Sequence, residues 1–243
     1  MRLVDERVST EQWCPRWIRY QHVARYRWLS PFIKDCLVVE AASGTGYGAE
    51  IILKGGAKRV DCFDTSAEAI QTARERYPAE GLHFELADVL NLPVPDHYCD
   101  AFVSLETIEH IEDDRGFLAE VRRVLKPGAK FICSTPNRTL TNPGTSIHDR
   151  PFNPYHVREY TFSEFESLLR SHFGSIDFYW QSEFGIWYSK LLSRIGGAVP
   201  RLAARLHQAR KLLGLPREIP ERHAPQRWPP AGEPEVLIAV CEV

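Results

Sequence analysis

The stretch VVEAASGTGYGAEIIL, residues 38–53, joins an apolar run to a glycine-rich turn and then to hydrophobic residues at helical spacing. This order is typical of the first strand, turn and helix of an open α/β sheet. Gly44 and Gly46 form a G-x-G pair, but Ala42 stands where a dinucleotide-binding turn has its first glycine. The stretch therefore predicts the fold, and the ligand of its turn has to be inferred from the rest of the chain.

The apolar runs that follow alternate with helical patterns. Strands are expected at 36–41, 59–64, 82–88, 100–106, 130–136, 175–182 and 236–243. Strands that alternate with helices favour parallel βαβ units, because a helix provides the crossover between parallel neighbours. The sequence predicts an α/β fold, Rossmann-like, with helices on both faces of the sheet.

Length and composition favour one domain over residues 1–243. The chain is 44% hydrophobic and 26% charged, which is enough apolar material for a sizeable core. An N-terminal cap helix is expected at about 10–34, and a basic helical and Pro-rich insertion at about 182–232. The insertion is compatible with a solvated helix face over an apolar lid, a clamp for a phosphorylated substrate, a membrane contact or an RNA-binding face.

Net charge and cysteine spacing limit which partners and which cellular compartment are expected. A formal net charge of −2 argues against general electrostatic capture of nucleic acid. The six cysteines show no CxxC spacing and are expected to be reduced, and no apolar run reaches the ~18 residues that span a bilayer. The N-terminal sequence shows no signal-peptide core. A cytoplasmic protein without a transmembrane segment is expected, and the sequence does not indicate its oligomeric state.

Acidic residues stand where the second and third strands end. Asp64 lies 18 residues beyond Gly46, at a spacing where a carboxylate can accept both hydroxyls of a ribose. Asp88 closes the third strand and can accept a hydrogen bond from an exocyclic amine. In open α/β sheets the carboxyl ends of the strands form the ligand site, but an Asp in such a place also suits a helix N-cap.

Four motifs in order resemble the class I S-adenosylmethionine-dependent methyltransferases: VVEAASGTGYG, FDTS at 63–66, LADVLNLP at 86–93 and RVLKPGAKFICSTPN at 123–137. The resemblance implies a seven-stranded sheet with the last strand antiparallel and S-adenosyl-L-methionine as cofactor. It implies a helix near the N-terminus that closes over the cofactor, although packing explains RYQHVARY equally well. The cofactor-binding residues that it implies are Glu40, Ala42, Gly44, Gly46, Asp64, Thr65, Asp88, Val89 and Leu105.

The segment ETIEH, residues 106–110, supplies candidates for the chemistry. Glu106, Glu109 and His110 share a face at helical spacing, and the polar loop 137–158 adds His156 or, less well, His148. The pattern resembles the metal-dependent small-RNA 2′-O-methyltransferases, and ubiquinone-pathway O-methyltransferases share the Glu-x-x-Glu-His element. That resemblance implies that Glu106, Glu109, His110 and His156 hold Mg²⁺ or Mn²⁺.

Two other readings of these residues stay open. One has Glu109, His110 and His156 in metal-free catalysis, with an imidazole as general base, and the other gives them structural roles only. The expected reaction is methylation of a hydroxyl on a small molecule with neighbouring hydroxyls, such as a sugar, a nucleotide sugar or a natural-product intermediate. The alternatives are N-methylation of an amine without a metal, 2′-O-methylation of RNA, or a catalytically silent module that senses the cofactor.

Overall fold

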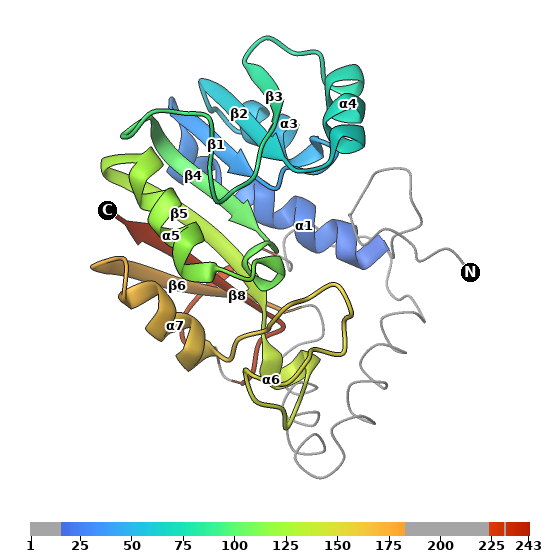
Figure 1. Ribbon diagram of the computed structural model, residues 1–243, viewed down its shortest axis with the longest axis vertical. Coiled ribbons are helices and arrows are strands. Elements are labelled where there is room, and N and C mark those ends of the chain that lie inside the picture. Colours follow the sequence, from blue (N-terminus) through green and yellow to red (C-terminus); the bar gives the residue numbers. More distant parts are fainter. Residues whose placement is uncertain (1–15, 183–223, 231) are drawn as a thin grey trace.

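The computed structural model describes residues 16–182, 224–230 and 232–243, and these form one twisted sheet flanked by helices (Figure 1). The eight strands follow the order β3-β2-β1-β4-β5-β8-β6-β7. In chain order they are β1 Leu37–Ala41, β2 Arg59–Asp64, β3 Leu82–Leu86, β4 Cys99–Leu105, β5 Leu125–Pro136, β6 Ser175–Gln181, β7 Gln226–Arg227 and β8 Val236–Glu242. All seven strands that the sequence predicts are present.

Strand direction reverses three times across the sheet, between β5 and β8, between β8 and β6, and between β6 and β7. The strands from β3 to β5 are parallel to their neighbours, whereas β8 is antiparallel to both β5 and β6. The antiparallel last strand expected from the family resemblance is therefore confirmed. The structure adds one strand, β7, which lies in the segment expected to be a Pro-rich insertion and pairs with β6. Two residues are too short to show the alternation of polar and apolar side chains by which a strand is recognised.

The helices occupy both faces of the sheet (Figure 1). They are α1 Arg16–Trp28, α2 Ser30–Ile33, α3 Tyr47–Lys54, α4 Ala67–Arg76, the 3₁₀ helix η1 Ile108–His110, α5 Asp114–Val124, α6 Arg138–Thr141 and α7 Phe162–Arg170. The single cap helix expected at 10–34 is two helices in its described part. Pro31 lies in the first turn of α2, where it lacks the N–H that a continuous helix requires. Residues 10–15, and the insertion apart from its ends, lie outside the described residues.

Two cores sandwich the sheet, and alternate residues of each strand enter different cores. Val38 packs with α1, α2, α3 and α4, whereas Val39 packs with α5 and α7. Both side chains are fully buried. The apolar runs of the sequence thus reflect burial on both faces, as in parallel sheets.

The described cysteines, Cys36, Cys62, Cys99, Cys133 and Cys241, are all free thiols. In the described ranges we find no helix that is both long and apolar enough to cross a bilayer.

The carboxyl ends of the parallel strands form one edge of the sheet. The residues after β1, β4 and β5 at this edge are Ala42, Glu106 and Asn137, and Asp64 is the last residue of β2. Ala42 and Glu106 have left-handed backbones, with φ of 58° and 54°. Non-glycine residues rarely adopt this conformation, and residues with such a strained backbone are common in functional sites. The strained residues therefore indicate a site at this edge of the sheet.

Candidate functional site

The glycine-rich turn between β1 and α3 reverses direction through left-handed residues. Gly44 and Gly46 have φ of 54° and 83°, and Ala42 shares this conformation although it carries a Cβ. A Cβ added to Gly44 would have no atom within 4 Å, whereas one on Gly46 would lie 2.9 Å from Ala73 and Phe84. Gly44 therefore leaves open space beside the turn, and Gly46 permits close packing beneath it.

Glu40 lies near the end of β1 with 1% of its surface exposed. Neither oxygen of its carboxylate has a hydrogen-bond partner in the described part of the chain. A Cβ on Gly48, in the first turn of α3, would lie 2.5 Å from Glu40 Oε1 and 2.3 Å from the ring of Tyr26. Burial raises the pKa of Glu40 to about 8. A buried carboxylate that receives no hydrogen bond from the described residues is suited to a cationic partner.

Asp64 binds the turn from the neighbouring strand. Its Oδ2 accepts a hydrogen bond from the Gly44 amide at 2.9 Å, and its Oδ1 accepts one from the Ser66 amide at 2.8 Å. These bonds fix the carboxylate at the strand end, and its remaining lone pairs can accept two hydroxyl groups. Thr65 beside it is exposed.

The loop after β3 combines a carboxylate with apolar side chains. Asp88 is exposed, and its Oδ1 accepts the Leu90 amide at 3.0 Å. Leu86 and Leu90 flank it with 54% and 39% of their surface exposed, which is unusual for leucine, whereas Val89 is buried. Leu105, at the end of β4, is also buried. A flat ring with an exocyclic amine would find both apolar contact and an acceptor at Asp88.

Glu106 is engaged by helix α1. Its Oε1 accepts hydrogen bonds from Arg25 Nη1 and Ser134 Oγ, both at 2.7 Å, and the Arg25 side chain is 1% exposed. Arg25 Nε donates to Gln181 Oε1 at 3.0 Å, so one guanidinium joins α1 to β4, β5 and β6. Burial alone would raise the pKa of Glu106, but the charges of Arg25 and His22 and the hydrogen bond from Ser134 together hold that pKa below its ordinary value.

Glu109, His110 and His156 converge at the same edge. Ligand atoms of the three side chains lie within 4.8 Å of one another. Glu109 is fully buried, and its Oε2 accepts from Thr135 Oγ1 at 3.0 Å while Oε1 has no partner in the described residues. Burial, and then the charge of Glu106, raises the pKa of Glu109 well above its ordinary range. The loop 137–158 is fastened here because the Glu109 carbonyl accepts the Val157 amide at 2.8 Å.

Hydrogen bonds assign the same tautomer to both imidazoles. His110 Nδ1 lies 3.0 Å from the Tyr155 carbonyl, and His156 Nδ1 lies 2.5 Å from Glu159 Oε1. Because both partners are acceptors, Nδ1 carries the proton in each ring and Nε2 keeps a lone pair. His156 Nε2 faces the Asn153 amide nitrogen at 2.9 Å, and the two rings are nearly perpendicular at 4.8 Å between centroids.

The structure thus separates the four residues predicted as metal ligands. Glu109, His110 and His156 lie together, whereas Glu106 is outside that group and is bonded to Arg25. His148 also lies outside it, on an exposed part of the loop. The roles of these residues stay predictions.

Comparison with known proteins identifies the family. The methyltransferase domain model matches residues 39–133, which run from β1 to β5. A Mycolicibacterium smegmatis protein described as a probable S-adenosylmethionine-dependent methyltransferase is 35% identical over 184 residues, covering 75% of this chain and 68% of that protein. The chain belongs to the S-adenosylmethionine-dependent methyltransferases.

Two further relatives agree with this family. A Mycobacterium tuberculosis protein with the same description is 37% identical over 153 residues, and this methyltransferase spans 53% of its length. Among solved structures, a Thermotoga maritima protein described as "SAM-dependent methyltransferase, possible histamine N-methyltransferase" superposes with a TM-score of 0.63 over 93% of each chain. At 17% identity, that likeness shows the fold alone.

The family implies S-adenosylmethionine as cofactor, and the residues of this methyltransferase fit it. The α-amino group of the cofactor is a cation, and Glu40 offers two buried oxygens without donors from the described chain. Open space beside Gly44 leaves room for a ligand against the turn, and Asp64 is fixed where a ribose would need its carboxylate. The cofactor residues expected from the sequence therefore surround one edge of the sheet.

The sequence assigns no role to Gly48 or Glu159, and it leaves Tyr26 open between a helix that closes over the cofactor and ordinary packing. The signal for Gly48 was present, since it is the third glycine of GTGYG. Glu159 stands three residues after His156, at a spacing that is typical of a local side-chain pair. Tyr26 had no such signal, because its neighbour Gly48 comes from another element of this methyltransferase.

Proposed function

We propose that this protein transfers the methyl group of S-adenosylmethionine to a hydroxyl of a small molecule that carries neighbouring hydroxyls. The observation that carries the proposal is the group of Glu109, His110 and His156, whose ligand atoms lie within 4.8 Å of one another. When bound, the cofactor supplies an activated methyl group on a sulfonium. The task of the chain is to align the acceptor oxygen and to remove its proton.

His156 is suited to act as the general base. Its Nδ1–H is held by Glu159, which is buried and also accepts hydrogen bonds from Thr141 and Asn142. A carboxylate behind an imidazole fixes the tautomer and stabilises the imidazolium that forms when Nε2 takes a proton. A base in this arrangement typically contributes about 10²–10⁴-fold to the rate. A hydroxyl is a poor nucleophile until its proton is removed, and an amine is a good one once it is neutral. The two imidazoles of His110 and His156 therefore favour a hydroxyl acceptor over an amine.

The same group fits a divalent cation. Glu109 Oε1 and the Nε2 atoms of His110 and His156 would hold the ion, with Asn153 yielding its contact to His156. Mg²⁺ and Mn²⁺ accept carboxylate ligands, and Mn²⁺ also accepts imidazole. An ion there would lower the pKa of a hydroxyl that binds it. Because Glu106 is bonded to Arg25, further coordination positions are left for two neighbouring hydroxyls of the acceptor.

The rim of this site favours a small acceptor with an apolar side. Tyr155 and Val157, on either side of His156, are 40% and 39% exposed, so they can contact a ring that reaches the base. The formal net charge of −2 gives no general attraction for RNA. A sugar fits these conditions best, a catechol comes next, and the 3′ end of an RNA is the runner-up.

Chelation tests the metal part of the proposal. Methyl transfer from labelled cofactor to a mixture of sugars and catechols would be measured with and without EDTA. We expect EDTA to lower turnover at least about tenfold and Mg²⁺ or Mn²⁺ to restore it. Full activity in EDTA excludes the metal and leaves His156 as a metal-free base.

Substitution tests the base. His156→Gln and Glu159→Gln should lower kcat by roughly 10²-fold or more while cofactor binding stays unchanged. The matched control is His148→Gln, which changes an exposed imidazole outside the group. An unchanged kcat in both site variants would exclude the pair of His156 and Glu159 as the general base. Methyl transfer to an amine, or to the 2′-hydroxyl of RNA, in place of a small-molecule hydroxyl would support the corresponding alternative.

A further inference from the structure

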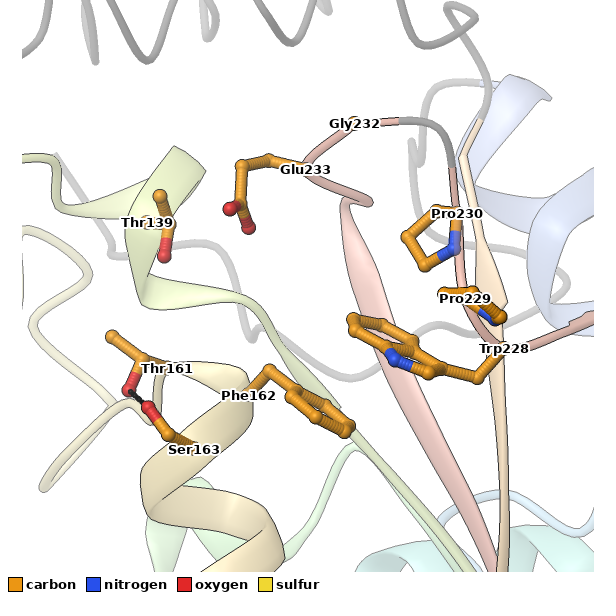
Figure 2. Close-up of a pocket in the computed structure, with 9 residues that line it drawn as sticks. All are labelled: Thr139, Thr161, Phe162, Ser163, Trp228, Pro229, Pro230, Gly232 and Glu233. Carbon is orange, nitrogen blue, oxygen red and sulfur yellow. Dashed lines mark hydrogen bonds between the residues drawn. The ribbon is translucent and has the colours of Figure 1, made fainter.

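A hollow of about 540 Å³ lies between α6, the start of α7, and residues 228–230 and 232–233, which precede β8 (Figure 2). This volume is in the range of small-molecule sites, about 300–1,000 Å³. The hollow is not formed by the cofactor turn or by the residues of the ETIEH segment. A ligand in this hollow would therefore contact other residues than the cofactor turn and the ETIEH segment.

One wall of the pocket is aromatic. The rings of Phe162 and Trp228 lie parallel, with 3.8 Å between centroids and 11° between planes. Pro229 and Pro230 continue this surface (Figure 2). The two stacked rings pack against the hydrophobic core, and together they form an apolar surface on which the flat face of a ligand ring can stack.

Polar groups with spare hydrogen-bonding capacity lie in this wall and across from it. The Thr139 hydroxyl and the Trp228 indole N–H make no hydrogen bond within the part of the chain that the structure describes. Glu233 uses Oε2 to accept from Asn137 Nδ2 at 3.0 Å, which leaves Oε1. Thr139 and Glu233 lie across the opening from Phe162 and Trp228 (Figure 2). Donors and acceptors thus stand opposite an apolar plane.

The charge of the pocket selects the kind of ligand. None of the described residues that line it is basic, and Glu233 is acidic. Phosphates and carboxylates are therefore disfavoured, since an anion would meet a carboxylate with no cation to offset it. A neutral ring with several hydroxyls can use the donors of Thr139 and Trp228, the acceptor of Glu233 and the apolar wall together.

Helix α6 joins this pocket to the proposed base. Thr139 lines the pocket, and Thr141, in the same helix of four residues, donates to Glu159, which holds His156. We propose that the pocket is a subsite for a second, neutral sugar ring of the acceptor, remote from the hydroxyl that is methylated. This inference rests on the proposed hydroxyl acceptor, and it names that acceptor as an oligosaccharide or glycoside.

Binding of neutral disaccharides to the full chain tests the subsite without any methyl transfer. Maltose and cellobiose would be the probes, with catechol, inorganic phosphate and glucose 6-phosphate as comparisons, by saturation-transfer NMR and titration. We expect a disaccharide to bind with a Kd tighter than about 10 mM. Thr139→Val removes a donor and keeps the shape, so it should weaken binding roughly two- to tenfold, the effect of one net hydrogen bond. Trp228→Phe removes the indole N–H and part of the apolar wall, so it should weaken binding at least as much.

Two controls separate this inference from the proposed reaction. Trp28→Phe, which changes a tryptophan packed on Phe32 and Tyr179 in the other core, should bind the sugar as the wild type does. His156→Gln should also bind it normally, because the subsite does not use the base. The inference is overturned if no disaccharide binds, if only catechol or an anion binds, or if all variants bind equally. Sugar binding without hydroxyl methylation would instead refute the proposed function alone.

Discussion

Cofactor binding should depend on pH through Glu40. Burial raises the pKa of this carboxyl to about 8, so below that pH it is mostly protonated in the free protein. The α-amino group that we expect beside it has a pKa of about 7.7–8.0 in solution and is a cation below that pH. An ion pair between them therefore requires Glu40 to lose a proton, and this loss becomes more costly as the pH falls.

The size of the effect follows from the pKa of about 8. At about pH 7 roughly one molecule in ten has an ionised Glu40, and at about pH 5.5 roughly one in three hundred. Affinity should then fall about 25-fold between these two pH values, which corresponds to about 1.9 kcal/mol.

Titration calorimetry with S-adenosylhomocysteine measures this without turnover. Two buffers with different ionisation enthalpies count the protons released, and we expect close to one per ligand at about pH 6. Glu40→Gln has nearly the same shape and cannot ionise, so its affinity should be flat over this range and its proton release near zero. Glu85→Gln, an exposed acid on β3, is the matched control and should behave as the wild type does.

The reasoning would be refuted by a wild-type affinity that is constant between about pH 5.5 and 7. It would also be refuted if Glu40→Gln kept the pH dependence of the wild type.

Three further predictions concern stability, measured by urea unfolding. Ala42→Gly should raise the free energy of unfolding by about 0.5–1 kcal/mol, because glycine relieves the φ of 58° and loses only part of that gain to chain entropy; a loss of stability would contradict this. Gly48→Ala should lower it by about 1–3 kcal/mol, since the new methyl group would lie 2.3 Å from the ring of Tyr26; an unchanged midpoint would show that the ring moves aside. Arg25→Met should cost about 3–5 kcal/mol by leaving the charge of Glu106 buried without its partner. Adding Glu106→Gln should recover much of this cost, and strict additivity of the two changes would exclude the ion pair.

The sequence predicts most of the sheet because burial on both faces leaves a local signal. The run RVDCFD predicts the observed bounds of β2, Arg59–Asp64, since it contains Val60, Cys62 and Phe63 and is followed by the turn residues Thr65 and Ser66. The antiparallel last strand came from family resemblance, not from the residues, because no local pattern states strand direction. β7 could not be predicted, since its two residues form a strand only where β6 provides an edge.

The site shows the same division between local and distant contacts. The Asp64 carboxylate was expected at its strand end because spacing along the chain places it there. The bond between Arg25 and Glu106 joins residues 81 positions apart, and the bond between Arg25 and Gln181 joins residues 156 apart. Contacts between residues so far apart produce no local pattern in the sequence. The expectation that Glu106 is a metal ligand rested on its local spacing to Glu109 and His110, whereas in the folded chain its carboxylate pairs with the Arg25 guanidinium.

The position of β8 between β5 and β6 also sets an order on synthesis. Synthesis of β6 ends about 60 residues before β8 is complete, at a synthesis rate of about 5–20 residues per second. During those seconds β6 has no β8 to pair with, and the open edge of β5 presents unpaired backbone groups. The nascent chain thus passes through a stage in which β5 and β6 both have unpaired edges, and residues 236–242 close both edges at once when they pair with the two strands.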